Sequence, residues 1–112
     1  GAEVNVKSET GDTALMAAAY QDNVELLKAL LEAGADVNST DEDGQTALMI
    51  AAENGKLQNV RALVLAGADI NLVDTEGKNA LVLAIECQHS TIIRFLRSRG
   101  AIESVAKVVV EE

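Results

Sequence analysis

Cys87 and His89 are the only cysteine and the only histidine of the chain, and they stand two residues apart. A histidine beside a cysteine can activate a thiolate for nucleophilic attack, so this pair is the strongest candidate for covalent chemistry. Catalysis also needs a concave site, whereas this pair falls at a junction between two expected helices, where a surface turn is expected. Structural zinc takes four ligands. We therefore expect no catalysis, no metal and no cofactor.

A second candidate for chemistry is a group of acidic residues. Asp41, Asp43 and Gly44 resemble part of a calcium-binding loop, but Ile50 stands where such a loop places its bidentate glutamate. The sequence gives no apolar pocket that would raise the pKa of a carboxyl group for acid–base work. We interpret these residues as a polar turn on a solvated face.

The motif Asn38-Ser39-Thr40 matches an N-glycosylation acceptor, but its asparagine recurs at Asn5 and Asn71, 33 residues away on either side, without the rest of the motif. We therefore expect the asparagine to have mainly a structural role.

The same spacing relates many other positions, among them Gly11, Gly44 and Gly77, and Leu15, Leu48 and Leu81. A fixed period of this length is typical of a solenoid, in which each unit buries its apolar face only against its neighbours.

The period divides the chain, which we predict to be a single domain over residues 1–112. Repeats are expected at residues 4–36, 37–69 and 70–102. Residues 1–3 match the end of a preceding repeat. Residues 103–112 leave the pattern and are predicted to form a C-terminal cap, for which we favour a short helix over a strand, because a terminal repeat lacks a neighbour on one side.

Each repeat contains the signals of two short helices. In the second copy, Thr46 is a good N-cap for a first helix over 47–53. Gly55 can take the left-handed conformation that ends a helix, and a second helix is expected over 57–66. In the third copy Gln88 replaces that glycine, which predicts a strained and reshaped turn.

These motifs resemble the ankyrin repeat family. Its Thr-Pro-Leu-His signature appears as Thr13-Ala14-Leu15-Met16, Thr46-Ala47-Leu48-Met49 and Asn79-Ala80-Leu81-Val82, a form similar to that of bacterial members. Proline and histidine are missing from every copy, so Met16, Met49 and Val82 are expected to provide packing instead of hydrogen bonds. The resemblance implies an all-α fold, an ankyrin-repeat solenoid of helix-turn-helix units joined by β-turn or hairpin loops, with about three repeats plus a cap.

The composition restricts the class of partner. The formal net charge is −9, and 48% of the residues are hydrophobic but only 2% aromatic. An acidic field repels nucleic acid and anionic membrane and attracts a basic protein surface. The alternative is that the acidity only keeps the domain soluble. No segment is long enough to span a membrane. The compartment stays open, with the cytoplasm slightly favoured over a secreted or periplasmic location.

In the ankyrin family, partners usually dock on the concave side, which comprises the loop tips and the exposed side of each first helix. Carried over by position, the resemblance places nine residues there, which we call the predicted contact residues: Glu9, Asp12, Tyr20, Glu42, Asp43, Gln45, Glu53, Glu76 and Glu86. Tyr20 is their only aromatic member, a type common among binding hot spots. Lys28, Arg61 and Arg94 recur on the second helix, where we expect the convex side.

Two functions from different classes follow from these features. The first is a protein–protein interaction module, acting as an adaptor or a stoichiometric inhibitor. The second is a structural segment of a longer array with no partner surface of its own. Self-association is also expected through an uncapped first repeat, because no preceding helix pair covers all of Leu26, Leu27 and Leu30.

Overall fold

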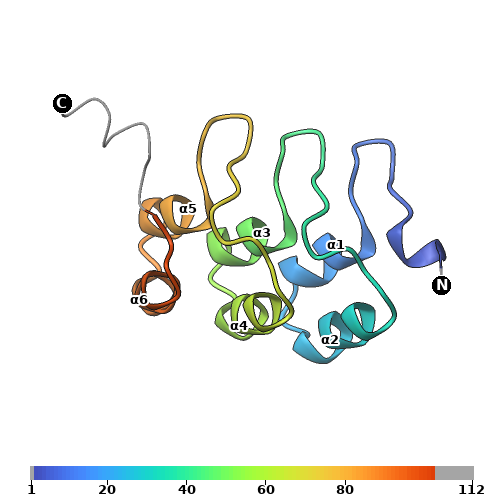
Figure 1. The fold of residues 1–112 in the computed structure, drawn as a ribbon, viewed down its shortest axis with the longest axis horizontal. Coiled ribbons are helices and arrows are strands. Elements are labelled where there is room, and N and C mark those ends of the chain that lie inside the picture. Colours follow the sequence, from blue (N-terminus) through green and yellow to red (C-terminus); the bar gives the residue numbers. More distant parts are fainter. Residues whose placement is uncertain (1, 103–112) are drawn as a thin grey trace.

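The computed structural model describes residues 2–102, which fold into three helix pairs preceded by a short 3-10 helix. The elements in chain order are η1 (Ala2–Asn5), α1 (Ala14–Tyr20), α2 (Val24–Glu32), α3 (Ala47–Glu53), α4 (Leu57–Leu65), α5 (Ala80–Glu86) and α6 (Ser90–Ser98). The first helices of the pairs form one layer and the second helices another (Figure 1). Within residues 2–102 no strand is present, so the expected all-α fold is confirmed. The predicted cap at 103–112 lies outside the described residues.

The first helix of every pair begins at the same kind of N-cap. The side-chain oxygens of Thr13, Thr46 and Asn79 accept hydrogen bonds from backbone N–H groups three residues later, at 3.3, 3.2 and 2.9 Å. Such caps satisfy donors that have no partner inside the helix. The predicted cap at Thr46 and the predicted helix over 47–53 are both confirmed. The second helix of that pair ends at Leu65, one residue before the predicted end.

The turn at Gln88 corrects one expectation. Gln88 has φ +63°, the only positive φ of a non-glycine residue in the described part of the chain, and Gly55 has φ +74° at the same place in the preceding pair. The turn is therefore strained, as predicted, but it is not reshaped. The surrounding helix and its contacts impose the glycine conformation on a glutamine at a cost of about 1–2 kcal/mol.

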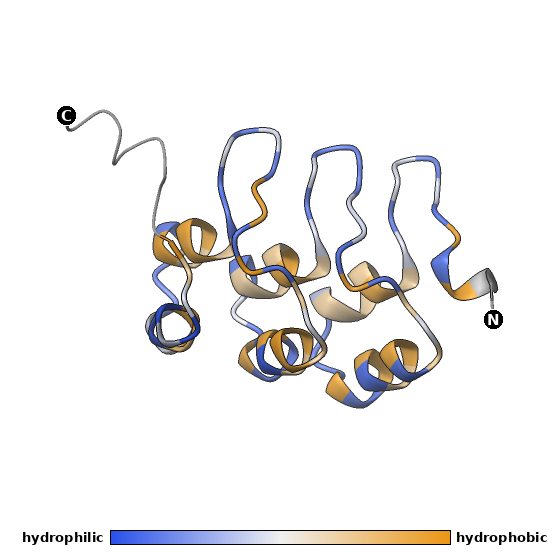
Figure 2. Ribbon diagram, viewed as in Figure 1, coloured by the Kyte–Doolittle hydropathy of each residue, from blue (hydrophilic) through white to orange (hydrophobic). Residues whose placement is uncertain are grey.

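The core lies between the two helix layers and between successive pairs. Small residues face inward on the first helices, which allows the helices to approach closely, and a leucine recurs in each pair: Leu15, Leu48 and Leu81 are each 1% exposed. Met16 and Met49 are also buried, which confirms that they provide packing. Figure 2 shows the apolar residues concentrated on the helices and the polar residues on the long loops.

Asparagine side chains connect one helix pair to the start of the next. The Oδ1 atoms of Asn5, Asn38 and Asn71 accept hydrogen bonds from the backbone N–H groups of Asp36, Asp69 and Ile102, at 2.7, 2.8 and 2.8 Å. Three equivalent bonds at the 33-residue spacing confirm that Asn38 has a structural role in the fold.

The apolar side chains of α2 differ from the expectation for an uncapped repeat. Leu27 is fully buried and Leu30 is partly buried, because both face the core between α1, α2 and the second pair. Leu26 alone of the three is exposed, at 43%. The open surface of the first pair is therefore smaller than the sequence predicts.

Candidate functional site

The long loops that precede the first helices are fixed by side-chain acceptors at their bases. Asp41 Oδ1 accepts from the N–H groups of Asp43 and Gln45, both at 2.9 Å, and Asp74 and Ser8 act in the same way in the other two loops. The carboxylate of Asp41 is thus part of the turn. Among residues 2–102, no three histidine, cysteine, aspartate or glutamate side chains are grouped in a way that could hold a metal ion.

Neighbouring loops touch each other edge to edge. The N–H of Glu42 donates to the carbonyl of Thr10 at 3.1 Å, and the N–H of Thr75 donates to the carbonyl of Asp43 at 3.0 Å. The approach depends on glycine: Gly44 has φ +75°, and a Cβ there would lie 3.1 Å from the backbone nitrogen of Thr75. The three loops project from the same side of the molecule (Figure 1) and are held as one row.

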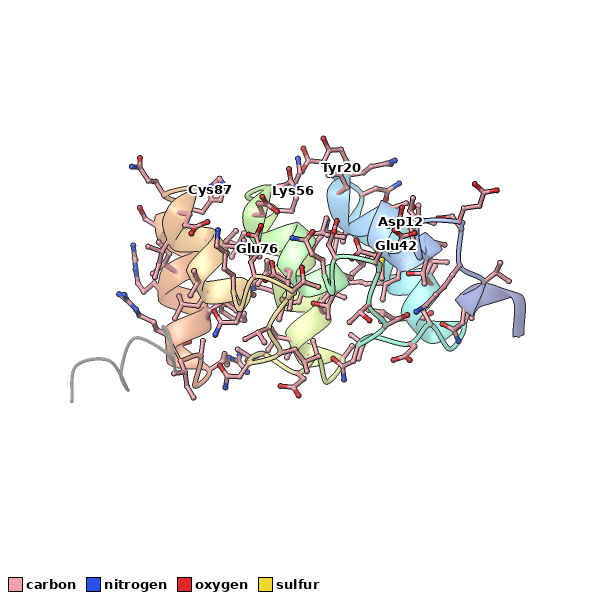
Figure 3. All side chains as sticks on the ribbon, turned by 90° about the horizontal axis from the view of Figure 1, so that it is seen from above. Asp12, Tyr20, Glu42, Lys56, Glu76 and Cys87 are labelled. Carbon is pink, nitrogen blue, oxygen red and sulfur yellow. The ribbon has the colours of Figure 1, made fainter. Side chains whose placement is uncertain are left out.

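The predicted contact residues fall into three groups by their place in the fold. Glu9, Glu42, Asp43 and Glu76 are exposed on the loops, and Tyr20, Glu53 and Glu86 are the last residues of α1, α3 and α5. Asp12 and Gln45 lie where a loop joins the following helix. Figure 3 shows Tyr20 at one edge of the molecule, beyond the loop that carries Glu42. The basic residues Lys28, Arg61 and Arg94 lie in the other layer, on α2, α4 and α6.

A groove of about 530 Å³ opens between α1 and α3. It brings together Asp12, Tyr20, Gln45 and Glu53, four of the predicted contact residues, with Gln21 and Asn54 beside them. Its apolar lining comes from Met16, Ala17 and Ile50. Ala17 and Ile50 were not among the predicted contact residues. The sequence does contain a signal for them. Both residues occupy the same position of the repeat, and each copy carries a different apolar residue there.

The third helix pair is electrostatically different. The Nζ atom of Lys78 lies 3.1 Å from a carboxylate oxygen of Glu86 and 3.4 Å from one of Glu76. The hydrogen bond to Glu86, followed by that to Glu76, raises the pKa of Lys78 above its usual value of 10.5. Two predicted contact residues therefore have an internal cation beside them, and we call this arrangement the Lys78 clamp.

The chain's histidine and cysteine have separate environments. The Nε2 atom of His89 lies 2.9 Å from the carbonyl oxygen of Glu53, so the imidazole connects the third helix pair to the end of α3. A Cβ on Gly55 would lie only 2.8 Å from the His89 ring, which shows how closely the ring packs there. Cys87 is exposed on the preceding turn. The candidate thiolate partner is thus engaged in holding two helix pairs together.

Asn59 is a buried polar residue that the sequence analysis missed. Its side-chain N–H₂ donates to the carbonyls of Gln21 at 2.8 Å and Ala19 at 3.0 Å, and the residue is 2% exposed. These bonds satisfy carbonyls at the end of α1, directly beside Tyr20. The signal in the sequence is a polar residue where the other copies place Leu26 and Ile92.

The fold is thus that of a repeat protein, in which helix pairs stack and their loops form one row. Its surface features are the groove between α1 and α3 and the tips of the loops. No helix within residues 2–102 has the length and apolar character needed to cross a bilayer. The family model for ankyrin repeats matches residues 15–107 in three copies, and the chain belongs to the ankyrin repeat family. No curated protein matches the sequence. Ankyrin repeats generally act as protein–protein interaction modules and are typically not enzymes.

Proposed function

We propose that this protein binds a partner protein with a basic surface, through the groove between α1 and α3 and the acidic loop tips beside it. The observation that carries the proposal is Tyr20, a large side chain that is 61% exposed at the rim of a partly apolar groove. An exposed aromatic residue beside an apolar depression is typical of an interface anchor. The module acts as an adaptor or a stoichiometric inhibitor and catalyses no reaction.

The charge distribution supports the choice of a basic protein over other partners. Within the described residues, the side chains of Glu42, Asp43 and Glu53 form no ion pair. Their charges are part of a formal net charge of −9, whose field repels nucleic acid and anionic membrane. Complementary charge across an interface acts mainly on the association rate and on specificity, whereas a desolvated aromatic anchor contributes more to affinity.

This division of roles gives a prediction for two variants. Glu42→Lys combined with Asp43→Lys is expected to slow association at least severalfold at low salt and to flatten its salt dependence. Tyr20→Ala is expected to accelerate dissociation by about 30-fold or more, which corresponds to about 2 kcal/mol of an anchor's contribution. A partner identified by native mass spectrometry of a pull-down, followed by surface plasmon resonance at two salt concentrations, measures both effects.

The matched control is Leu65→Ala, which removes an exposed apolar side chain from α4, away from the groove. This variant should bind as the wild type does. If the double-lysine variant and the wild type bind alike and neither responds to salt, the acidic surface serves only solubility and the partner docks elsewhere.

The alternative function, a structural segment of a longer repeat array, is favoured by the open side of the first helix pair. Leu26 occupies the position at which Asn59 and Ile92 are 2% exposed, yet it is 43% exposed itself. Val6, in the segment that precedes the first pair, is 63% exposed. Apolar surface left open at a stacking position favours contact with another apolar surface.

The same open surface predicts self-association of the isolated domain. Sedimentation velocity at increasing protein concentration should show reversible dimers, and Leu26→Lys should shift the species back to monomer. Leu65→Lys, which adds the same charge at a site that is 73% exposed, should leave the dimers unchanged. A clean monomer at high concentration in the wild type would show that residues 2–12 cover the first pair sufficiently.

A further inference from the structure

The third helix pair contains an ion pair that indicates which kind of side chain the groove could bind. In that pair, Lys78 at the foot of the loop reaches Glu86 at the end of α5, with the two residues eight positions apart. The same two positions in the second pair are Gln45 and Glu53, at the 33-residue spacing. Gln45 carries no charge, and within residues 2–102 the carboxylate of Glu53 forms no ion pair. The second pair thus has the carboxylate of the Lys78 clamp without its lysine.

The surroundings of Glu53 are suited to a long cationic side chain that comes from outside. Met16, Ala17 and Ile50 give the groove apolar surface, and the aromatic ring of Tyr20 stands at its rim beside the acidic Asp12. Lysine and arginine bury a methylene stem on apolar surface while their charged ends reach a carboxylate, and an aromatic face attracts the same cation. A neutral side chain would gain the apolar contacts without the charge pairing, and an acidic one would be repelled by Glu53 and Asp12.

We propose that the groove receives one lysine or arginine side chain of the basic partner, which pairs with Glu53 in the way that Lys78 pairs with Glu86 inside the chain. This inference rests on the proposed function and makes it more specific. It confines the anchor site to the first two helix pairs, because the equivalent carboxylate of the third pair is already occupied by the Lys78 clamp.

The structure offers a variant that closes the site without distorting it. Gln45→Lys places a lysine at the position of Lys78 and within reach of Glu53, so the chain would supply the missing cation itself. Gln45→Met is the matched control, because it has a similar length and no charge. Gln45 is partly exposed and its side chain forms no hydrogen bond within residues 2–102, so both variants are expected to fold.

The test is an NMR titration of the ¹⁵N-labelled protein, residues 1–112, with an acetylated and amidated Gly-Ser-Arg-Ser-Gly peptide. The same peptide with citrulline replacing arginine is the neutral isostere. The arginine peptide is expected to shift the amide signals of Tyr20, Ile50 and Glu53 in a saturable way, and the citrulline peptide to bind about fivefold more weakly or not at all. Gln45→Lys should weaken binding of the arginine peptide about fivefold relative to Gln45→Met, because the two variants remove the same glutamine and differ in the charge that replaces it.

Three results would overturn the inference. Equal binding of the arginine and citrulline peptides would show that the groove does not recognise the cation. Shifts confined to Glu42 and Asp43, and unchanged by Gln45→Lys, would place the basic contact on the loop tips and leave the proposed function standing. No shift at any residue would remove the groove as an anchor site, and the salt dependence of the Glu42→Lys and Asp43→Lys variant would then decide the proposed function independently.

Discussion

Replacing Leu48 by alanine is expected to lower the free energy of unfolding by about 2–5 kcal/mol. Leu48 is 1% exposed and lies on α3, the first helix of the middle pair, which packs against both α1 and α5. Removing its side chain loses the transfer free energy of the buried carbons and leaves a cavity that helices on both sides hold open. Since domains are typically stabilised by about 5–15 kcal/mol in total, the variant should lose a large share of its stability.

Chemical denaturation monitored by circular dichroism measures the loss. Leu65→Ala is the matched control, because the same atoms are removed from a residue that is 73% exposed, and its effect should stay within about 0.5 kcal/mol. A loss below about 1 kcal/mol for Leu48→Ala would contradict the packing described for α3.

Deletion of residues 70–112 is expected to abolish cooperative unfolding altogether. The deletion removes α5 and α6, and with them the surfaces that cover one side of α3 and α4. Two helix pairs cannot bury a continuous core, since each pair depends on its neighbours for the burial of its apolar face. The fragment should therefore melt gradually, with reduced helix content at all temperatures.

Thermal unfolding followed by circular dichroism and by calorimetry tests this expectation. A second deletion, of residues 103–112 only, keeps all three helix pairs and should keep a single transition, with a lowered midpoint if these residues form the predicted cap. A sharp transition in the shorter fragment would argue against a core shared between neighbouring pairs.

The fold could be predicted from the sequence because its determinants are local and repeated. Thr46 caps a helix by bonding to a backbone group three residues away, and Gly55 ends that pair's first helix by adopting a positive φ. Neither interaction depends on residues that are distant in the sequence. The predicted first helix over 47–53 therefore matched the structure, and the family followed from the spacing of such signals.

The details of the candidate site could not be predicted in this way, because they depend on where individual side chains meet in space. Lys78, two residues before α5, reaches Glu86 at the end of that helix only because its side chain extends along the helix. Asn59 meets the carbonyl of Gln21 only because of how α4 stacks on the first pair. The 33-residue period gives the positions that face one another but not the distances between side chains. For the same reason Leu27 was expected at an open surface and is instead in the core.

Asn59 also determines the order in which these modules can be assembled. Its buried amide is satisfied only by carbonyl groups at the end of the helix in the pair before it. If the second unit were moved to the first position, that amide would lose its three carbonyl acceptors, on Ala18, Ala19 and Gln21, and an unsatisfied buried polar group costs about 1–3 kcal/mol. Leu26 and Ile92 occupy the same position in the other units. Because their side chains are apolar, they do not restrict the order of the units in this way. The three units look alike in sequence, yet one hydrogen-bonded side chain means that they cannot be exchanged freely. The second unit must follow a unit whose first helix supplies those carbonyl groups.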